Sequence, residues 1–362
     1  MQTIPRTMSG VLLKGHGGFD QLEFRTDIPV PKPVADEVLV RIGAAGVNNT
    51  DINTRTAWYS RAVVEGTTEQ GAADGFSSGA AADSGWTGTE HTFPRIQGAD
   101  GCGHIVAVGP DVSSARVGER VLLEPVIRTV RNGAEHVTYF GSECDGAFAQ
   151  FAVIPARNAH LVACELTDAE LASFPCSYGA AEHMIERCRV GSRDRVLVTG
   201  ASGGVGSAAV QLAARRGAHV IAITSASKAA AVKDLGAEAT VARDADLVSA
   251  LGRESVDVVI DVVGGDQFPV LLEVLRRRGR YAVAGAISGP VVKLDLRTLY
   301  LKDLRFEGCT VFDPSVFSNL VGYIERSEVR PVIAGVHPLR DIVRAQREFS
   351  TKAHTGKIVL TP

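Results

Sequence analysis

The first third of the chain alternates short apolar runs with turn-forming residues. The runs at 10–14, 22–24, 37–42 and 104–109 are rich in Val, Leu and Ile, and Pro or Gly lies between them. Short aliphatic runs that are bounded by turn residues are typical of β-strands. The pattern therefore predicts a β-rich region in the first third of the chain.

After residue 165 the pattern changes, and strand-like runs alternate with segments of helical periodicity. Strands are predicted at 196–199, 219–224, 256–263, 280–285 and 304–311. Helices are predicted at 166–172, 207–216, 227–235 and through 271–275. Apolar strands that alternate with amphipathic helices favour a parallel, doubly wound sheet. A last apolar run at 356–360 predicts one more strand, which can return to the first region.

One segment, residues 61–91, follows neither pattern. It is rich in Gly, Ala, Ser and Thr and shows no periodicity. A long connection without periodicity inside a compact domain is either a mobile lid with a function or a disordered insertion. Both alternatives remain open from the sequence.

Composition and charge exclude several classes of protein. The 362 residues are 45% hydrophobic and 22% charged, with a net charge of −3, which predicts a soluble protein with two cores and no basic surface for nucleic acid or an anionic membrane. No apolar run approaches the roughly 20 residues that span a bilayer, and the first residues do not resemble a signal peptide. The six cysteines form no C-x-x-C pair, so we expect reduced thiols and a cytoplasmic location.

The clearest chemical motif follows the strand predicted at 196–199. The sequence Gly200-Ala-Ser-Gly-Gly-Val-Gly leads directly into a predicted helix. Glycines in such a turn allow backbone N–H groups to approach a pyrophosphate, and the helix N-terminus adds partial positive charge. The strand–turn–helix context therefore predicts a dinucleotide site. Its candidate residues are Ser202, Gly203, Gly204, Val205 and Gly206.

The end of the next predicted strand indicates which dinucleotide is bound. An NAD site carries an acidic residue there, which bonds to the ribose hydroxyl. This chain has Thr224-Ser-Ala-Ser-Lys instead, with no acidic residue before Lys228. Ser225 and Lys228 can accept a 2′-phosphate, which an acid would repel, although Ser225 can also act as a helix cap. The sequence thus predicts NADP(H) as the cofactor.

Several motifs resemble those of the medium-chain dehydrogenase/reductase superfamily, and most closely its zinc-free quinone oxidoreductase and enoyl reductase branch. They are Gly46-Val-Asn-Asn-Thr-Asp, Gln97-Gly-Ala-Asp-Gly-Cys-Gly-His, Gly118-Glu-Arg-Val, Gly146-Ala-Phe-Ala-Gln-Phe, the glycine-rich turn, Gly285-Ala-Ile-Ser-Gly and Gly356-Lys-Ile-Val-Leu. The resemblance covers nearly the whole chain, and its motifs occur in the family's order.

This resemblance implies an α/β fold with a GroES-like β-rich catalytic domain and a Rossmann domain with a doubly wound parallel sheet. The expected boundaries are 1–165 for the catalytic domain, 166–312 for the NADP(H)-binding Rossmann domain, and 313–362 for the return to the catalytic domain. The cofactor would lie between the domains, with further contacts at Val263, Ala286 and Lys357. The resemblance also implies a homodimer that pairs the edge strands at 304–311.

The same resemblance argues against a metal. Zinc-dependent relatives place a cysteine where Asn48 stands and a histidine where Ala99 stands, and only Cys176 remains as a possible ligand. A catalytic zinc needs three protein ligands. We therefore expect no metal site, and a reaction that does not depend on zinc.

Without a metal, a substrate carbonyl needs another partner. The resemblance implies that Tyr59 donates a hydrogen bond or proton after hydride transfer to a conjugated carbonyl compound, because a phenol is protonated at neutral pH. Asn48 would position cofactor or substrate, and Asp51 would brace the loop through an ion pair. The alternatives are that Tyr59 only anchors the loop and that Asn48 only forms a turn.

The expected function is that of an NADPH-dependent oxidoreductase that reduces an activated C=C bond or a quinone in a small-molecule substrate. One alternative is a zinc-type alcohol dehydrogenase. The other is a catalytically weak NADPH-binding protein with a structural or sensing role.

Overall fold

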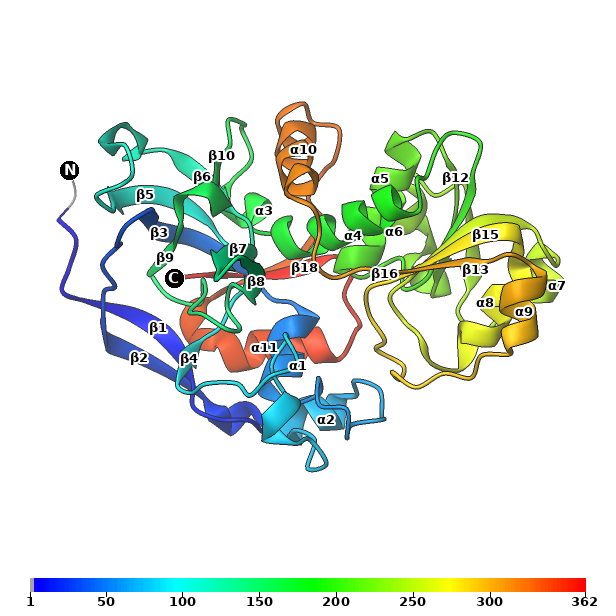
Figure 1. Ribbon diagram of the computed structural model, residues 1–362, viewed down its shortest axis with the longest axis horizontal. Helices are drawn as coiled ribbons and strands as arrows, with labels where there is room; N and C mark the ends of the chain where they lie inside the picture. The colour runs from blue at the N-terminus through cyan, green and yellow to red at the C-terminus, as the bar shows by residue number, and fades with distance from the viewer. Residues whose placement is uncertain (1–2) are drawn as a thin grey trace.

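The computed structural model describes residues 3–362, which form a β-rich half and an α/β half that lie side by side (Figure 1). The strands of the β-rich half that precede residue 165 are β1 (Thr7–Leu13), β2 (Leu22–Pro29), β3 (Glu37–Gly46), β4 (Arg95–Ile96), β5 (Cys102–Val108), β6 (Arg120–Leu123), β7 (Val126–Arg131), β8 (Ala134–Tyr139), β9 (Phe151–Pro155) and β10 (Ala159–Leu161). Its short helices are α1 (Asn49–Arg55), α2 (Glu69–Asp74) and α3 (Asp168–Leu171). The strands predicted in the first third of the chain are thus present.

The α/β half has the parallel sheet that the alternating pattern predicts. Its strand order is β13-β12-β11-β14-β15-β16, and every neighbouring pair is parallel. The strands are β11 (Arg195–Val198), β12 (His219–Thr224), β13 (Ala239–Ala242), β14 (Val256–Asp261), β15 (Leu275–Val283) and β16 (Arg305–Gly308). The helices are α4 (Pro175–Arg187), α5 (Gly204–Arg215), α6 (Ala229–Lys233), α7 (Leu247–Leu251), α8 (Phe268–Val274) and α9 (Leu296–Leu301).

Both faces of this sheet are covered, which explains its continuous apolar strands. In β11 the side chains of Val196 and Val198 belong to one core cluster and that of Leu197 belongs to another. Successive residues of a strand point to opposite faces, so each face needs its own apolar partners. The sequence pattern missed the short elements β13, α7 and α9, and the predicted strand at 304–311 is shorter in the structure.

The end of the chain returns to the β-rich half. It forms α10 (Pro314–Glu325), β17 (Ile333–Pro338), α11 (Ile342–Ser350) and β18 (Lys357–Thr361). Strand β18 pairs in parallel with β17 and antiparallel with β3, so the last strand completes the first sheet. Helix α10 packs against α4 of the other half. The strand predicted at 356–360 therefore lies in the sheet of the β-rich half, as expected.

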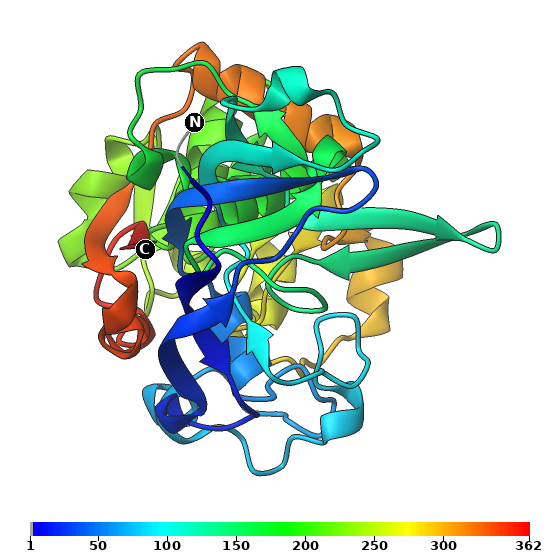
Figure 2. The same cartoon turned by 90° about the vertical axis from the view of Figure 1, so that its left-hand side faces the viewer.

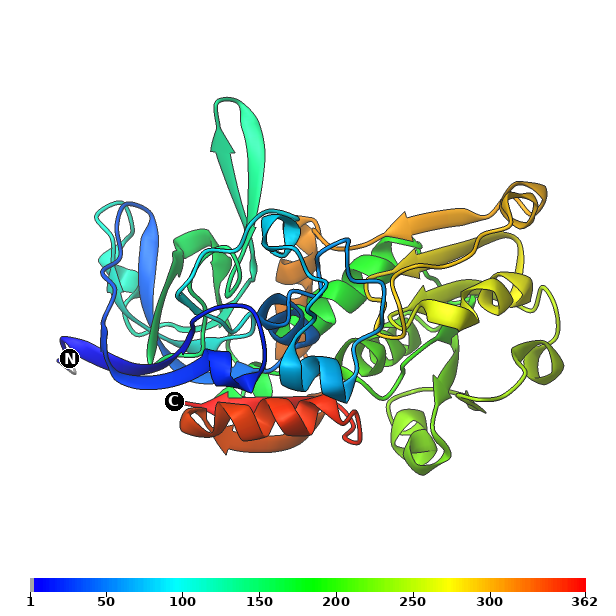
Figure 3. The same cartoon turned by 90° about the horizontal axis from the view of Figure 1, so that it is seen from below.

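The segment 61–91 has short ordered elements and buried anchors. Helix α2 lies within it and packs beside α11 (Figure 3). The guanidinium of Arg55, which is fully buried, donates hydrogen bonds to the carbonyl oxygens of Gly17 and Ala72, both at 2.8 Å. These bonds join the segment to the β1–β2 turn and to α1. The structure thus favours a folded insertion that is fixed to its surroundings.

No helix within residues 3–362 combines the length and the apolar character that crossing a bilayer requires.

Candidate active site

Two adjoining cavities lie between the halves of the molecule. The first, which we call the cofactor cleft, is lined by the glycine-rich turn, the end of β12, and the segment between α11 and β18. The second, which we call the substrate cavity, is lined by α1, the insertion, the start of α4 and the end of β15. Asn49, Gly204, Val205, Ile287 and Phe349 line both, so the two cavities are continuous.

The glycine-rich turn needs its glycines for space and for backbone conformation. Gly200 has φ +56°, a region that favours glycine. A Cβ atom on Gly206 would lie 2.2 Å from the carbonyl oxygen of Gly200, so the helix start could not approach the strand end so closely. The first N–H groups of a helix have no partner within it and can face an anion. The predicted residues Ser202, Gly203, Gly204, Val205 and Gly206 all line the cofactor cleft.

At the far end of the cleft lie two of the predicted residues and a third that the sequence did not indicate. Ser225 and Lys228 line the cleft together with Arg243, which follows β13. The ammonium of Lys228 donates to the carbonyl oxygens of Lys352 and His354, at 2.8 and 2.7 Å, which leaves one N–H for a ligand. Sequence reasoning missed Arg243 because it missed the strand β13 that positions it.

A second missed residue, Lys352, faces the glycine-rich turn across the cleft. Its ammonium donates to Asn49 Oδ1 at 2.7 Å and lies 4.0 Å from the centroid of the Phe349 ring. Burial lowers the pKa of Lys352 to about 7. No local pattern marks this lysine, because it reaches the cleft only through the return of the chain to the β-rich half.

Unpartnered polar atoms show that the cleft suits a ligand. Thr224 Oγ1 and His354 Nδ1 are buried, line the cleft and have no hydrogen-bond partner among the described residues. Buried polar groups in proteins are normally satisfied. The glycine turn, these two atoms and the nearby cations together fit a phosphate-bearing dinucleotide. The predicted residue Val263 also lines the cleft, whereas Ala286 and Lys357 line the substrate cavity.

Lys357 is the centre of a closed polar network beneath the substrate cavity. Its ammonium contacts Asp100 Oδ2 at 2.8 Å and the carbonyl oxygen of Val47 at 2.9 Å, and it also donates to Asn48 Oδ1. All three N–H groups of the ammonium are therefore used. Asp100 Oδ1 accepts the backbone N–H of Cys176 at 2.6 Å, which joins the network to the start of α4.

Asn48 serves this network and also begins α1. Its side-chain amide donates to Asp100 Oδ2 at 2.9 Å. Its backbone N–H donates to Asp51 Oδ2 at 2.7 Å, and the two residues form a capping box. Asp51 braces the loop through backbone N–H groups, so the predicted ion pair is wrong. Burial raises the pKa of Asp51 to about 7, and the nearby carboxylate of Asp100 also raises it.

The predicted proton donor, Tyr59, lines the substrate cavity. Its hydroxyl donates to Thr50 Oγ1 at 3.0 Å. Burial raises the pKa of Tyr59 to about 12, so the phenol is protonated at neutral pH. Asn53, one helical turn after Asn49, also lines the cavity, and its buried Oδ1 has no partner within the described chain. Residues four apart lie on the same face of a helix, so the spacing of Asn49 and Asn53 in the sequence could have indicated that both face the cavity.

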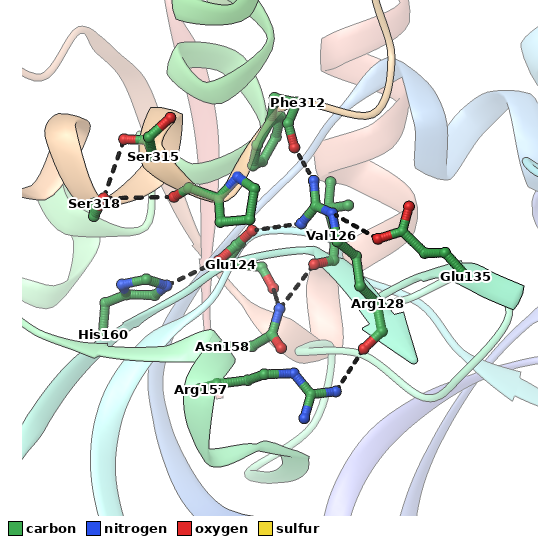
Figure 4. A network of polar contacts seen from close by, with 11 residues as sticks. Glu124, Val126, Arg128, Glu135, Arg157, Asn158, His160, Phe312, Ser315 and Ser318 are labelled. Carbon is green, nitrogen blue, oxygen red and sulfur yellow. Dashed lines mark hydrogen bonds and ion pairs between the residues drawn. The ribbon is translucent and has the colours of Figure 1, made fainter. Parts of the chain in front are cut away.

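A long-range network holds another lining residue of the substrate cavity, Phe312, in place. Phe312 lines the cavity, and its carbonyl oxygen accepts a hydrogen bond from the guanidinium of Arg128 (Figure 4). Arg128 lies on β7, in the hairpin that extends away from the body of the protein (Figure 2). Glu124 Oε1 contacts the same guanidinium at 3.3 Å, and its Oε2 contacts His160 Nε2 at 2.9 Å. The network therefore fixes the connection between the two halves.

Both halves of the chain are similar to known protein families. Residues 34–164 match the model of the alcohol dehydrogenase GroES-like domain, and residues 204–326 match that of the zinc-binding dehydrogenase family. A solved structure from Sinorhizobium meliloti 1021, described provisionally as an alcohol dehydrogenase, is 46% identical, covers 99% of this chain and 98% of its own, and has a TM-score of 0.87. The chain belongs to the medium-chain dehydrogenase/reductase superfamily.

More distant members of this superfamily have assigned reactions. An acryloyl-coenzyme A reductase from Metallosphaera sedula is 25% identical over 98% of this chain and 100% of its own length. An NADPH-dependent alkenal/one oxidoreductase from Arabidopsis thaliana is 24% identical over 99% of this chain and 81% of its own length. The comparisons confirm the predicted fold class, and the chain is an oxidoreductase of this superfamily.

The described residues of this superfamily member contain no group of three His, Cys, Asp or Glu side chains placed to hold a metal ion. Asn48, which stands where zinc-dependent relatives are expected to place a cysteine ligand, is bonded instead to Asp100 and Lys357. The backbone N–H of Cys176 bonds to the same Asp100. The hydroxyl of Tyr139 donates to Cys176 Sγ at 3.3 Å. Burial raises the pKa of this thiol to about 12, so it stays protonated at neutral pH.

Proposed function

We propose that the protein reduces a C=C bond conjugated to a carbonyl group, or a quinone, with NADPH as the hydride donor. One observation carries this proposal: a protonated, half-buried phenol, Tyr59, lines a cavity that is continuous with the dinucleotide cleft. The names of the acryloyl-coenzyme A reductase and the alkenal/one oxidoreductase support the same class of reaction.

The preference for NADPH over NADH rests on the far end of the cleft. Ser225, Lys228 and Arg243 line it, and the cleft has no acidic side chain among its described lining residues. Two cations and a hydroxyl favour a 2′-phosphate, which adds negative charge and acceptor oxygens. The phosphates of the dinucleotide would be held by the glycine-rich turn and by Lys352.

The residues of the substrate cavity have separate tasks in this reaction. A bound nicotinamide supplies a hydride, that is, two electrons and one hydrogen, to the β-carbon of the substrate. The hydroxyl of Tyr59 holds the proton that the resulting enolate needs; it donates to Thr50 Oγ1 at 3.0 Å and would turn its O–H from Thr50 to the substrate, and the Thr50 hydroxyl can then donate to the phenol oxygen. The network of Lys357, Asp100 and Asn48 positions α1, which carries Thr50.

We further propose that the reaction does not use zinc. Asn48 and Ala99 replace the side chains that zinc-dependent relatives use, and the amide of Asn48 bonds Asp100 while its oxygen accepts from Lys357. A positively charged ammonium at this point disfavours a second cation.

The test is to follow the loss of NADPH absorbance with enones, quinones and enoyl thioesters, in parallel with NADH. We expect turnover with at least one class and a preference for NADPH of at least about tenfold, which corresponds to one charge-assisted interaction of about 1.5 kcal/mol. A matched Ser225→Asp variant should reverse the cofactor preference. No turnover with any acceptor, or zinc-dependent oxidation of alcohols alone, would overturn the proposal.

Homodimer formation is a separate proposal, and it rests on the edge of the Rossmann sheet. Strand β16 is the last strand of that sheet. The neighbouring side chains of Leu296, Tyr300 and Leu301 are apolar and 57–64% exposed. These three residues belong to α9, which precedes β16, and an unpaired edge strand near an exposed apolar helix face can pair with a second copy. Sedimentation should show a dimer at micromolar concentration, and a monomer there would exclude it.

A further inference from the structure

The insertion at residues 61–91, together with residues 58–60 that lead into it, bridges the substrate cavity from one half of the molecule to the other. On one side, the backbone N–H of Thr67 donates to the carbonyl oxygen of Ile287 at 2.8 Å. On the other side, the backbone N–H of Thr87 donates to Glu143 Oε1 at 3.0 Å. Because Ile287 lines both cavities, the insertion is anchored beside the point where cofactor and substrate meet.

The face that the insertion turns to the cavity is aromatic. Trp86 stacks on Tyr139, with ring centroids 4.4 Å apart and an interplanar angle of 26°. Trp58 lies beside Tyr59 at 5.9 Å, and its indole N–H is used by the carbonyl oxygen of Glu65 at 2.9 Å. All four rings line the substrate cavity. With the Trp58 donor already satisfied, this ring offers mainly its apolar surface to a ligand.

The insertion carries a net negative charge. Residues 58–91 contain five carboxylates and a single arginine, with His91 neutral. Among the described residues that line the substrate cavity, Lys357 alone carries a formal charge, and its ammonium is fully used by Val47, Asn48 and Asp100. A coenzyme A thioester carries several phosphate charges, which need cations at the entrance. The lining of the substrate cavity offers no free cation for them, and the carboxylates of the insertion add negative charge to this side of the molecule.

We infer that the insertion is the specificity-determining wall of the substrate cavity, and that it selects an uncharged enone or quinone with a flat ring over a coenzyme A thioester. This inference rests on the proposed function and adds to it the substrate class. It departs from the reaction named for the acryloyl-coenzyme A reductase relative. The aromatic wall stacks on the ring of the substrate, while the hydroxyl of Tyr59 faces its carbonyl oxygen.

The first experiment measures kcat/KM with NADPH for three acceptors that each carry a β-substituted C=C bond conjugated to a carbonyl group. These are 4-phenylbut-3-en-2-one, pent-3-en-2-one and crotonyl-coenzyme A. A single aromatic contact is worth about threefold to tenfold, so we expect the phenyl enone to exceed the alkyl enone by about tenfold. The thioester should be the poorest acceptor, and its kcat/KM should rise with salt as repulsion is screened.

The second experiment asks whether the insertion is the source of that preference. Trp86→Ala should reduce the ratio of phenyl to alkyl enone by about threefold to tenfold, whereas Trp86→Phe should retain most of it. Unchanged binding of NADPH, measured by cofactor fluorescence, shows that each variant is folded. Glu65→Gln combined with Glu90→Gln should raise kcat/KM for the thioester and leave the enone ratio as it was.

These outcomes separate the inference from the proposed function. If no acceptor oxidises NADPH, the proposed function itself fails. If both enones are reduced equally well, if the thioester is the best acceptor, or if Trp86→Ala keeps the full ratio, the proposed function stands and the inference is overturned.

Discussion

The cofactor cleft and the substrate cavity adjoin, yet they are built in different ways. The floor of the cleft is one contiguous segment, 200–206, whose backbone conformation and N–H groups form the binding surface. The cavity is lined by side chains from α1, the insertion, α4 and the linker after β16. The comparison teaches that a site made of backbone can be predicted from a motif, whereas a site made of converging side chains depends on the packing of distant segments.

Two lysines five residues apart show the same contrast. The ammonium of Lys357 has three acceptors and is 3% exposed, so it is a structural cation. The ammonium of Lys352 donates to Asn49 alone among side chains and faces the cleft, so it can still meet a ligand. The predictions below test this division between structural and ligand-facing groups, beginning with the largest expected effect.

Replacing Lys357 with Met should destabilise the protein the most. It leaves the buried carboxylate of Asp100 without its cation, and removal of one partner from a buried pair costs about 3–5 kcal/mol. Denaturant unfolding measures the loss. The double variant with Asp100→Asn should recover part of it, because no charge is then left unpaired. A loss below about 1 kcal/mol, as for an exposed pair, would show that the network is not structural.

Tyr59→Phe should lower kcat by about 100-fold, because a positioned proton donor contributes about that factor or more. The change removes one oxygen and keeps the ring, so NADPH affinity should stay within about twofold of the parent. Single-turnover measurements at saturating NADPH separate the chemical step from product release. A variant with the same kcat as the parent would show that Tyr59 is not the proton donor, and a parent that binds NADPH but turns over no acceptor would favour a binding protein without catalysis.

Gly206→Ala should weaken NADPH binding by about tenfold to a hundredfold. The added Cβ would lie 2.2 Å from the carbonyl oxygen of Gly200, and backbone strain of this kind costs about 1–3 kcal/mol. Fluorescence titration with NADPH measures the affinity. Gly191→Ala is the matched control, since a Cβ there meets no atom within 4 Å. Equal affinities for the two variants would contradict the role of the glycine turn.

The smallest effect is a pH dependence of cofactor affinity. Because burial lowers the pKa of Lys352 to about 7, its amine loses its proton as pH rises from 6.5 to 8.5. A cation near the cofactor phosphates favours binding only while it is protonated, so the Kd for NADPH should rise by up to about tenfold over that range. Lys352→Arg stays charged throughout, so its Kd for NADPH should be low and independent of pH. Lys352→Met is never charged, so its Kd should be high and independent of pH. A slope that persists in the arginine variant would assign it to another group.

Prediction from the sequence was successful where the interactions are local. The strand at 219–224 and the turn before α5 were predicted at their observed positions because apolar runs and glycines determine them within a few residues. Helix α5 begins at Gly204, three residues earlier than predicted, because the glycines of the turn themselves enter the helix. The short elements β13 and α9 were missed, because four to six residues give too little periodicity.

The sequence alone determined the superfamily, the parallel sheet and the residues of the phosphate-binding turn, since these depend on backbone geometry within contiguous segments. Only the tertiary structure decided that Lys357 is enclosed by Asp100 and Asn48, that Lys352 and Arg243 line the cofactor cleft, and that Trp86 stacks on Tyr139 in the wall of the substrate cavity. The physical reason is range. Secondary structure is set by neighbours along the chain, whereas the charge, burial and partners of a side chain are also set by segments more than 300 residues away, as in the bond between Asn49 and Lys352, which are 303 residues apart.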